Sequence, residues 1–166
     1  MAAGVPDAAR DARVLVAHAA GVPATEVGIR REDRLDGSAE TRLSVALDAR
    51  VARQPVAQII GHRAFWQHVF EVTGDVLDPR PETETLVAAA LEGPPPTRIL
   101  DLGTGSGCIV LSLLAAWPEA TAVATDQSAA ALKVAARNAD RMGVRRRLTL
   151  LRGNWLKPVC GRFNLV

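Results

Sequence analysis

The feature that most constrains this chain is an apolar strand that runs directly into three alternate glycines. The segment reads Ile99-Leu-Asp-Leu-Gly-Thr-Gly-Ser-Gly107. Because glycine has no Cβ, such a turn can adopt positive φ and let a ligand lie against bare backbone. In an open α/β sheet, ligands bind at the carboxyl ends of the strands. We therefore expect a binding site immediately after Leu102.

The spacing of the glycines indicates the kind of ligand. A dinucleotide fingerprint, GxGxxG, needs glycine where the sequence has Cys108, and a phosphate loop needs Lys-Ser/Thr after the last glycine, which does not occur. Asp101, ahead of the loop, would repel a pyrophosphate but can receive an ammonium group. Asp126, nineteen residues after Gly107 at the end of the next expected strand, can accept both hydroxyls of a ribose. A cationic nucleoside therefore fits better than a dinucleotide.

S-adenosyl-L-methionine meets these demands, because it carries an ammonium, a sulfonium, a ribose and an adenine but no phosphate. Asn154 and Trp155 offer an amide acceptor for the adenine amino group and an aromatic surface for its ring. Taken singly, the loop could be a tight turn without a ligand, Asp126 a helix-capping acid, and Trp155 a core aromatic. Together they predict this cofactor, bound by Asp101, Gly103, Thr104, Gly105, Ser106, Gly107, Asp126, Asn154 and Trp155.

Strand and helix patterns alternate around the glycine loop. The expected elements are a strand at 98–102, a helix to about Ala116, a strand at 121–126, a Ser128-capped helix to Met142, and a strand at 148–152. Gly143 is expected to end the second helix. This alternation predicts an α/β fold with a parallel sheet and right-handed crossovers.

The chain ahead of this unit has a different composition and residue pattern. An Ala- and Arg-rich part predicts a small all-α bundle, with helices at 6–20 and from a Ser38 N-cap to Val51, and a short helix near Thr25. The second helix spaces Leu43, Leu47 and Val51 four apart. Two short strands about a tight turn, at 62–66 and 69–73, predict a β-hairpin. Pro79 and Pro81 then keep the chain extended, and Thr83 is expected to cap a helix that carries Leu86, Val87 and Leu91.

Composition excludes several classes of protein. The 166 residues are 48% hydrophobic and carry a net charge of +2, without an apolar stretch long enough for a membrane span or a signal-peptide pattern, so a cytoplasmic protein without a membrane partner is expected. Arg145 to Arg147 form the one basic run, which favours a solvated turn over a nucleic-acid patch. Cys108 and Cys160 lack metal-ligand spacing, so no metal is expected. The three histidines, His18, His62 and His68, have no partner motif for catalysis.

The sequence resembles the release factor glutamine methyltransferases. The resemblance runs through Gln54-Pro-Val-Ala57 with Gly61, Phe65-Trp66, Asp78-Pro-Arg-Pro-Glu-Thr-Glu84, the glycine loop, Thr125-Asp126, Arg137-Asn138 and Gly153-Asn-Trp155. It implies a Rossmann-like, class I S-adenosylmethionine-dependent methyltransferase domain with a seven-stranded sheet. The domains implied are a helical substrate-docking domain at 1–54, a hairpin linker at 55–77, and the first part of the methyltransferase domain at 78–166.

The reaction that the resemblance implies is methylation of a glutamine side-chain amide nitrogen in peptide chain release factors, which would be the protein partners. It places Arg80, Pro81, Glu82 and Thr83 along the cofactor pocket, although Glu82 and Glu84 could equally be acids that stabilise a helix N-terminus. Asp78 stands where an aliphatic residue is common, and Asn154 where Asp is more usual.

Family members continue past a strand like Phe163-Asn-Leu-Val166 into Asn-Pro-Pro-Tyr, and this sequence stops before that tetrapeptide. The motif would hold the target amide, so no residue of this chain is assigned a catalytic role. We also expect the sheet to present a sticky open edge. Two alternatives remain: a non-catalytic fragment that binds S-adenosylmethionine or a release factor, and a methyltransferase for another protein glutamine or a nucleic-acid base amine.

Overall fold

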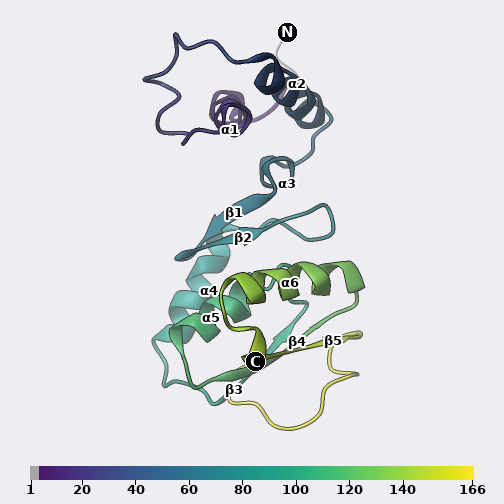
Figure 1. Ribbon diagram of the computed structural model, residues 1–166. Coiled ribbons are helices and arrows are strands. Elements are labelled where there is room, and N and C mark those ends of the chain that lie inside the picture. The colour runs from purple at the N-terminus through teal and green to yellow at the C-terminus, as the bar shows by residue number, and fades with distance from the viewer. Residues whose placement is uncertain (1–3) are drawn as a thin grey trace. The chain divides into compact units, whose positions relative to one another are not determined.

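The computed structural model describes residues 4–166, so the first three residues of the expected 1–54 domain lie outside the described part. Contacts divide the chain into two compact units, Met1–Gly61 and His62–Val166 (Figure 1). The hairpin therefore packs with the second unit. Whether 1–54, 55–77 and 78–166 behave as separate domains stays a prediction.

The first unit contains the expected helices, α1 (Ala8–Ala20) and α2 (Gly37–Val51), followed by a short α3 (Val56–Ile60). α1 ends at Gly21, which adopts φ 68°. The Arg42 guanidinium donates to the Ala19 carbonyl at 2.7 and 3.1 Å, which supplies partners at the end of α1. An ion pair of 2.7 Å between Arg50 and Asp11 joins the two helices.

Two expectations for this unit are wrong, the N-cap of α2 and the short helix near Thr25. Asp36, not Ser38, is the N-cap of α2, because its carboxylate reaches both the Ala39 N–H at 2.7 Å and the Ser38 hydroxyl at 2.6 Å. Within α2, which forms as expected, Leu47 and Val51 are exposed and the small residues Ala39 and Ala46 are buried. The region near Thr25 forms successive turns rather than a helix, with Gly28, a poor helix former, in its middle.

The second unit begins with the expected hairpin, formed by the antiparallel strands β1 (His62–Phe65) and β2 (His68–Glu71). Trp66 occupies the turn with φ 54°. Phe65 and Phe70 are buried and pack edge to face, with ring centroids 6.0 Å apart. The Trp66 N–H donates to the Glu84 carboxylate at 2.9 Å, which fastens the turn to the next helix.

That helix is α4 (Pro81–Leu91), and it starts earlier than expected. Arg80 is its N-cap residue and Pro81 its first residue, because the fixed φ of proline suits a position whose N–H needs no helical partner. Thr83 therefore lies inside the first turn instead of capping it. Val87 is buried, and Leu86 is exposed.

A parallel sheet of order β3-β4-β5 follows, from β3 (Arg98–Leu102), β4 (Thr121–Asp126) and β5 (Leu148–Arg152). The expected strands, their connecting helices and their parallel pairing are confirmed, so the unit has a Rossmann-like α/β fold. α5 (Cys108–Ala116) follows the glycine loop directly. α6 (Ala129–Arg141) begins at Ser128, whose hydroxyl accepts from the Ala131 N–H at 3.2 Å. Beside β3, on the side away from β4, Leu165 makes a single parallel bridge to Ile99 where a strand was expected.

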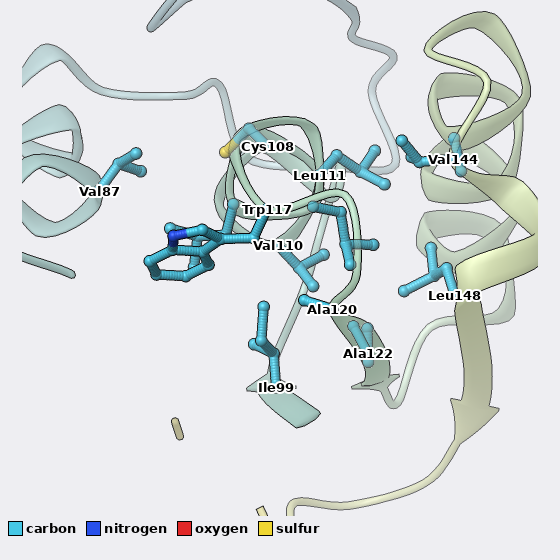
Figure 2. Close-up of a cluster of buried hydrophobic side chains, with 14 of the residues drawn as sticks. Val87, Ile99, Cys108, Val110, Leu111, Trp117, Ala120, Ala122, Val144 and Leu148 are labelled. Carbon is cyan, nitrogen blue, oxygen red and sulfur yellow. The ribbon is translucent and has the colours of Figure 1, made fainter. Parts of the chain in front are cut away.

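The helices α4, α5 and α6 lie on the same face of this sheet (Figure 1). Figure 2 shows the core between them, in which Val110 and Leu111 of α5 meet Ile99 and Ala122 of the sheet, with Trp117 alongside. The run Arg145–Arg147 is a 3-10 turn leading into β5. The Arg147 guanidinium donates at 2.7 to 2.9 Å to the carbonyls of Leu114, Trp117 and Ala120, which lie in the last turn of α5 and in the loop after it.

Candidate cofactor site

A cavity of about 220 Å³ opens at the carboxyl ends of the three parallel strands. Each strand end contributes to its wall, because parallel strands bring their carboxyl ends to the same edge of a sheet. The lining residues are Leu102, Gly103, Thr125, Asp126, Gln127, Gly153, Asn154 and Trp155.

The three glycines of the loop after β3 serve two different purposes. Gly103 and Gly105 adopt φ +76° and +54°, and a Cβ built on either would meet no atom within 4 Å. A Cβ on Gly107 would come within 2.9 Å of Leu111 Cδ1. The first two glycines therefore present bare backbone to open space, whereas the third allows the start of α5 to pack closely.

The loop is held against β4 by hydrogen bonds. The N–H groups of Gly103 and Thr104 both donate to the Thr125 carbonyl at 2.9 Å. Asp126 accepts from the Gly105 N–H at 3.0 Å through one carboxylate oxygen and from the Ser128 N–H at 2.8 Å through the other. A carboxylate offers about four lone-pair positions, so both oxygens keep capacity for ligand hydroxyls. Asp126 thus both holds the N-cap residue of α6, Ser128, and faces the cavity.

Asp101 has a different environment. Its carboxylate accepts a hydrogen bond from the Thr104 hydroxyl at 2.7 Å and lines a second cavity, of about 270 Å³, between β3, α4 and α5. Burial raises the pKa of this carboxyl above its usual value, and the nearby Asp126 carboxylate raises it further, while the Thr104 hydrogen bond opposes the shift. A positively charged group would therefore be a favourable neighbour. Leu102 lines both cavities.

The loop after β5 completes the wall of the first cavity. Trp155 is 70% exposed, so it is not a core aromatic, and its backbone adopts the left-handed φ of 51°. Such a conformation is uncommon for a bulky residue and persists only where the surrounding structure maintains it. Gly153 is required by close packing, since a Cβ there would lie 2.6 Å from Pro158 Cγ.

The cavity brings together only part of the set expected from the sequence. Gly103, Asp126, Asn154 and Trp155 line it, whereas Asp101, Thr104, Gly105, Ser106 and Gly107 form the end of β3 and the frame of the loop. The expected pocket-wall residues are the N-cap and first turn of α4 and are not among the lining residues of either cavity: Arg80, Pro81, Glu82 and Thr83. The predicted site set lacks four lining residues, each of which is next to a predicted one in the sequence: Leu102, Thr125, Gln127 and Gly153.

Cys108 directly follows the glycine loop but is not a candidate nucleophile. Burial raises the pKa of the Cys108 thiol to about 11, so it is protonated at neutral pH and a poor nucleophile. Within residues 4–166 no three His, Cys, Asp or Glu side chains form a group that could hold a metal ion. None of the helices in the same residues has the length and apolar character needed to cross a membrane.

Two family models match the chain. A PrmC N-terminal domain matches residues 1–61, and a methyltransferase small domain matches residues 76–166. A release factor glutamine methyltransferase from Cereibacter sphaeroides is 52% identical over 165 residues, covering 99% of this chain and 59% of that protein. One from Rhodospirillum rubrum is 44% identical over 168 residues, covering 99% of this chain and 51% of that protein. The chain thus spans about half to three fifths of the length of these curated relatives.

Among solved structures, a SAM-dependent methyltransferase from Geobacter sulfurreducens in complex with S-adenosyl-L-homocysteine is 34% identical. The match covers 45% of this chain and 29% of that chain, with a TM-score of 0.39. The fold assignment rests instead on the strand order and connections described above.

Proposed function

Because the chain belongs to the release factor glutamine methyltransferase family, with a PrmC N-terminal domain ahead of a methyltransferase small domain, we propose that it binds S-adenosyl-L-methionine for the methylation of a glutamine side-chain amide in peptide chain release factors. The observation that carries this proposal is the cavity that gathers Gly103, Asp126 and Trp155 from three strand ends. We propose that the protein acts in the cytoplasm, where translation takes place.

The residues of the cavity fit such a cofactor, whose contribution is an electrophilic methyl group on a sulfonium. Asp126 accepts the ribose hydroxyls, and the bare backbone at Gly103 lets the ligand approach the loop. Trp155 offers its exposed indole to the adenine, and Asn154 accepts from the adenine amino group. A volume of about 220 Å³ is below the roughly 300–1,000 Å³ of pockets that enclose a whole ligand. Asp101, which lines the second cavity beside Leu102, would hold the ammonium end.

The second cavity is our candidate for the acceptor side of the reaction. It is lined by Leu86 and Ala90 of α4 together with Asp101. Arg80 and Glu82 lie at the start of the same helix but line neither cavity, and their role in orienting neighbours along the pocket stays a prediction. An amide nitrogen is a poor nucleophile because its lone pair is delocalised, so it must be held in line with the sulfur–methyl bond. The family resemblance assigns this task to Asn-Pro-Pro-Tyr, a sequence that this chain does not contain.

Cofactor binding is tested by titrating the protein with S-adenosyl-L-methionine and S-adenosyl-L-homocysteine while tryptophan fluorescence is recorded. Trp155 is exposed at the cavity, Trp117 is buried in the core, and Trp66 lies in the hairpin turn. The Trp155→Phe variant should lose most of the fluorescence change, whereas the matched Trp66→Phe variant should keep it. An equal change in both variants, or no uptake of either compound by the folded wild-type protein, would contradict the proposal.

Methyl transfer is tested with labelled S-adenosyl-L-methionine, a release factor, and a release factor whose target glutamine is replaced by alanine. Label on the first protein only supports the proposed activity. Label on nucleic acid or on another protein supports a different acceptor. Cofactor binding without transfer to any acceptor supports a binding module.

A further inference from the structure

Asn138 links two parts of the second unit that are distant in the sequence. It lies on α6, is 1% exposed, and does not line the cofactor cavity. Its Oδ1 accepts from the Glu71 N–H at 2.7 Å, and its Nδ2 donates to the Glu71 carbonyl at 3.1 Å and to the Ser106 carbonyl at 2.9 Å. Glu71 is the last residue of β2, and Ser106 belongs to the glycine loop. One carboxamide therefore bonds both the hairpin and the loop.

The bond to Ser106 fixes the peptide that precedes Gly107. With its carbonyl held by Asn138, this peptide directs the Gly107 N–H to the Thr104 carbonyl at 2.8 Å, which closes the turn. Glycine-rich segments have the most conformational freedom to lose, so a fixed peptide in their middle limits the whole loop. The loop geometry that presents Gly103 and Gly105 to the cavity thus depends on a residue behind it.

The hairpin side of this link is reinforced by charge. The Glu71 carboxylate pairs with Arg137 at 2.6 Å and Arg141 at 3.1 Å, both on α6. The hydrogen bond from Arg137 lowers the pKa of Glu71, so the carboxylate is charged at neutral pH. The end of β2 is therefore bound to α6 through both its backbone and its side chain.

We propose that Asn138 is a positioning residue that couples the end of the hairpin to the glycine loop and thereby sets the affinity for the cofactor without touching it. The affinity part rests on the proposed function. Asparagine suits this place because its short carboxamide supplies one acceptor and two donors together. Displacement of the β2 end is then transmitted to the loop through these three hydrogen bonds.

The coupling is tested by amide hydrogen exchange of the ligand-free protein, measured over 68–72 and 103–107. Asn138→Asp keeps the acceptor for the Glu71 N–H but removes both donors, and Asn138→Ala removes all three hydrogen bonds. Exchange should increase about tenfold in both segments. Lys133→Gln is the matched control, because it changes the net charge by the same amount at an exposed position of α6 and should leave exchange unchanged.

Glu71→Gln is a second variant that leaves the Asn138 side chain and the backbone groups that bind it in place. It weakens the two ion pairs, and exchange should rise a few-fold both at the β2 end and in the loop. If the β2 end exchanges faster in these variants while the loop does not, the coupling is contradicted.

Affinity is measured by calorimetry with S-adenosyl-L-methionine. Asn138→Asp should bind about tenfold more weakly at pH 8 than the wild type. A protonated carboxyl can again donate to one of the two carbonyls. The ratio of the dissociation constants of Asn138→Asp and the wild type should therefore become smaller as the pH falls to about 5.5. The charged groups around the introduced carboxyl are Glu71, Arg137 and Arg141. Affinity within twofold of wild type, or a ratio independent of pH, would overturn the positioning role. If the wild type itself does not bind, the proposed function fails, and exchange still decides the coupling.

Discussion

The ends of β3 and β4 lie side by side, and each carries an aspartate in a different setting. Asp126 accepts two backbone N–H groups, at 2.8 and 3.0 Å, whereas Asp101 accepts one hydroxyl, at 2.7 Å. Backbone donors are fixed by the fold, so the Asp126 carboxylate is oriented before any ligand arrives. The charge of Asp101 is less compensated, and its pKa is raised by burial. Under the proposed function, we therefore predict that Asp126 orients neutral hydroxyls and that Asp101 attracts a cation.

The largest effect should come from removing the Asp126 carboxylate. Asp126→Ala deletes the acceptors for Gly105 and Ser128 and for the ligand hydroxyls, so we expect affinity for S-adenosyl-L-methionine to fall about 100-fold by calorimetry. Asp126→Asn, which keeps one acceptor oxygen, should lose less. Asp140→Asn, an exposed change on α6, is the control and should bind like the wild type. Unchanged binding by Asp126→Ala would remove this carboxylate from the site.

Asp101→Asn should distinguish the role of Asp101 from that of Asp126. We expect it to weaken cofactor binding about tenfold and to raise the melting temperature at pH 7. The amide still accepts from the Thr104 hydroxyl but carries no charge. Since burial raises the pKa of Asp101 in the fold, ionising this carboxyl costs free energy of folding, and the neutral amide avoids that cost. Calorimetry and thermal melting measure the two effects. A lower melting temperature would show that the buried charge is compensated.

Affinity for the cofactor should fall with decreasing pH because Asp101 becomes protonated. As the pH falls through its raised pKa, the carboxylate is protonated and loses its attraction for an ammonium, so affinity should fall several-fold before an ordinary aspartate, with a pKa of 3.8, would respond. The contribution of Asp101 to the free energy of unfolding changes with pH in the opposite direction. It is complete below the unfolded pKa and is lost as the pH rises through the folded pKa. Dissociation constants from pH 8 to 5 test this, and an identical slope in Asp101→Asn would contradict it.

The smallest effect should be at Asn154, where the family usually has Asp. Both side chains present an acceptor oxygen at the cavity wall, so Asn154→Asp should change cofactor affinity by less than about threefold. Competition binding with S-adenosyl-L-homocysteine measures so small a difference. A change of tenfold or more would place this side chain among the main determinants of affinity, beside Asp126.

The sequence predicted those features whose causes are local. The sheet, its helices and the Ser128 cap follow from patterns within about fifteen residues, and they are confirmed. The two misplaced helix starts share one cause. In each, the sequence predicts a hydroxyl residue, Ser38 or Thr83, as the cap, whereas an earlier residue, Asp36 or Arg80, occupies that position.

Links between distant segments could not be predicted in the same way. Asn138 reads as one polar residue of an amphipathic helix, and only the fold brings it to Glu71, 67 positions away. Glu84 likewise reads as an acid in a first helical turn, yet it accepts from the Trp66 N–H. In the candidate site, the glycines and Asp126 carry a spacing signal, whereas Thr125 at the end of β4 and Gln127 just after it carry none and line the cavity as neighbours of Asp126.

The three consecutive arginines before β5 illustrate how a basic run can differ from a basic surface. Arg147 directs its guanidinium to three carbonyls, and Arg145 donates to the Leu148 carbonyl. Lysine could not serve three acceptors with the same planar fork, so a Lys at 147 would not be a conservative replacement. Two of the three arginines thus bind the connection between α6 and β5 to its neighbours. The number of arginines in the run therefore overstates the number of side chains available to bind a polyanion.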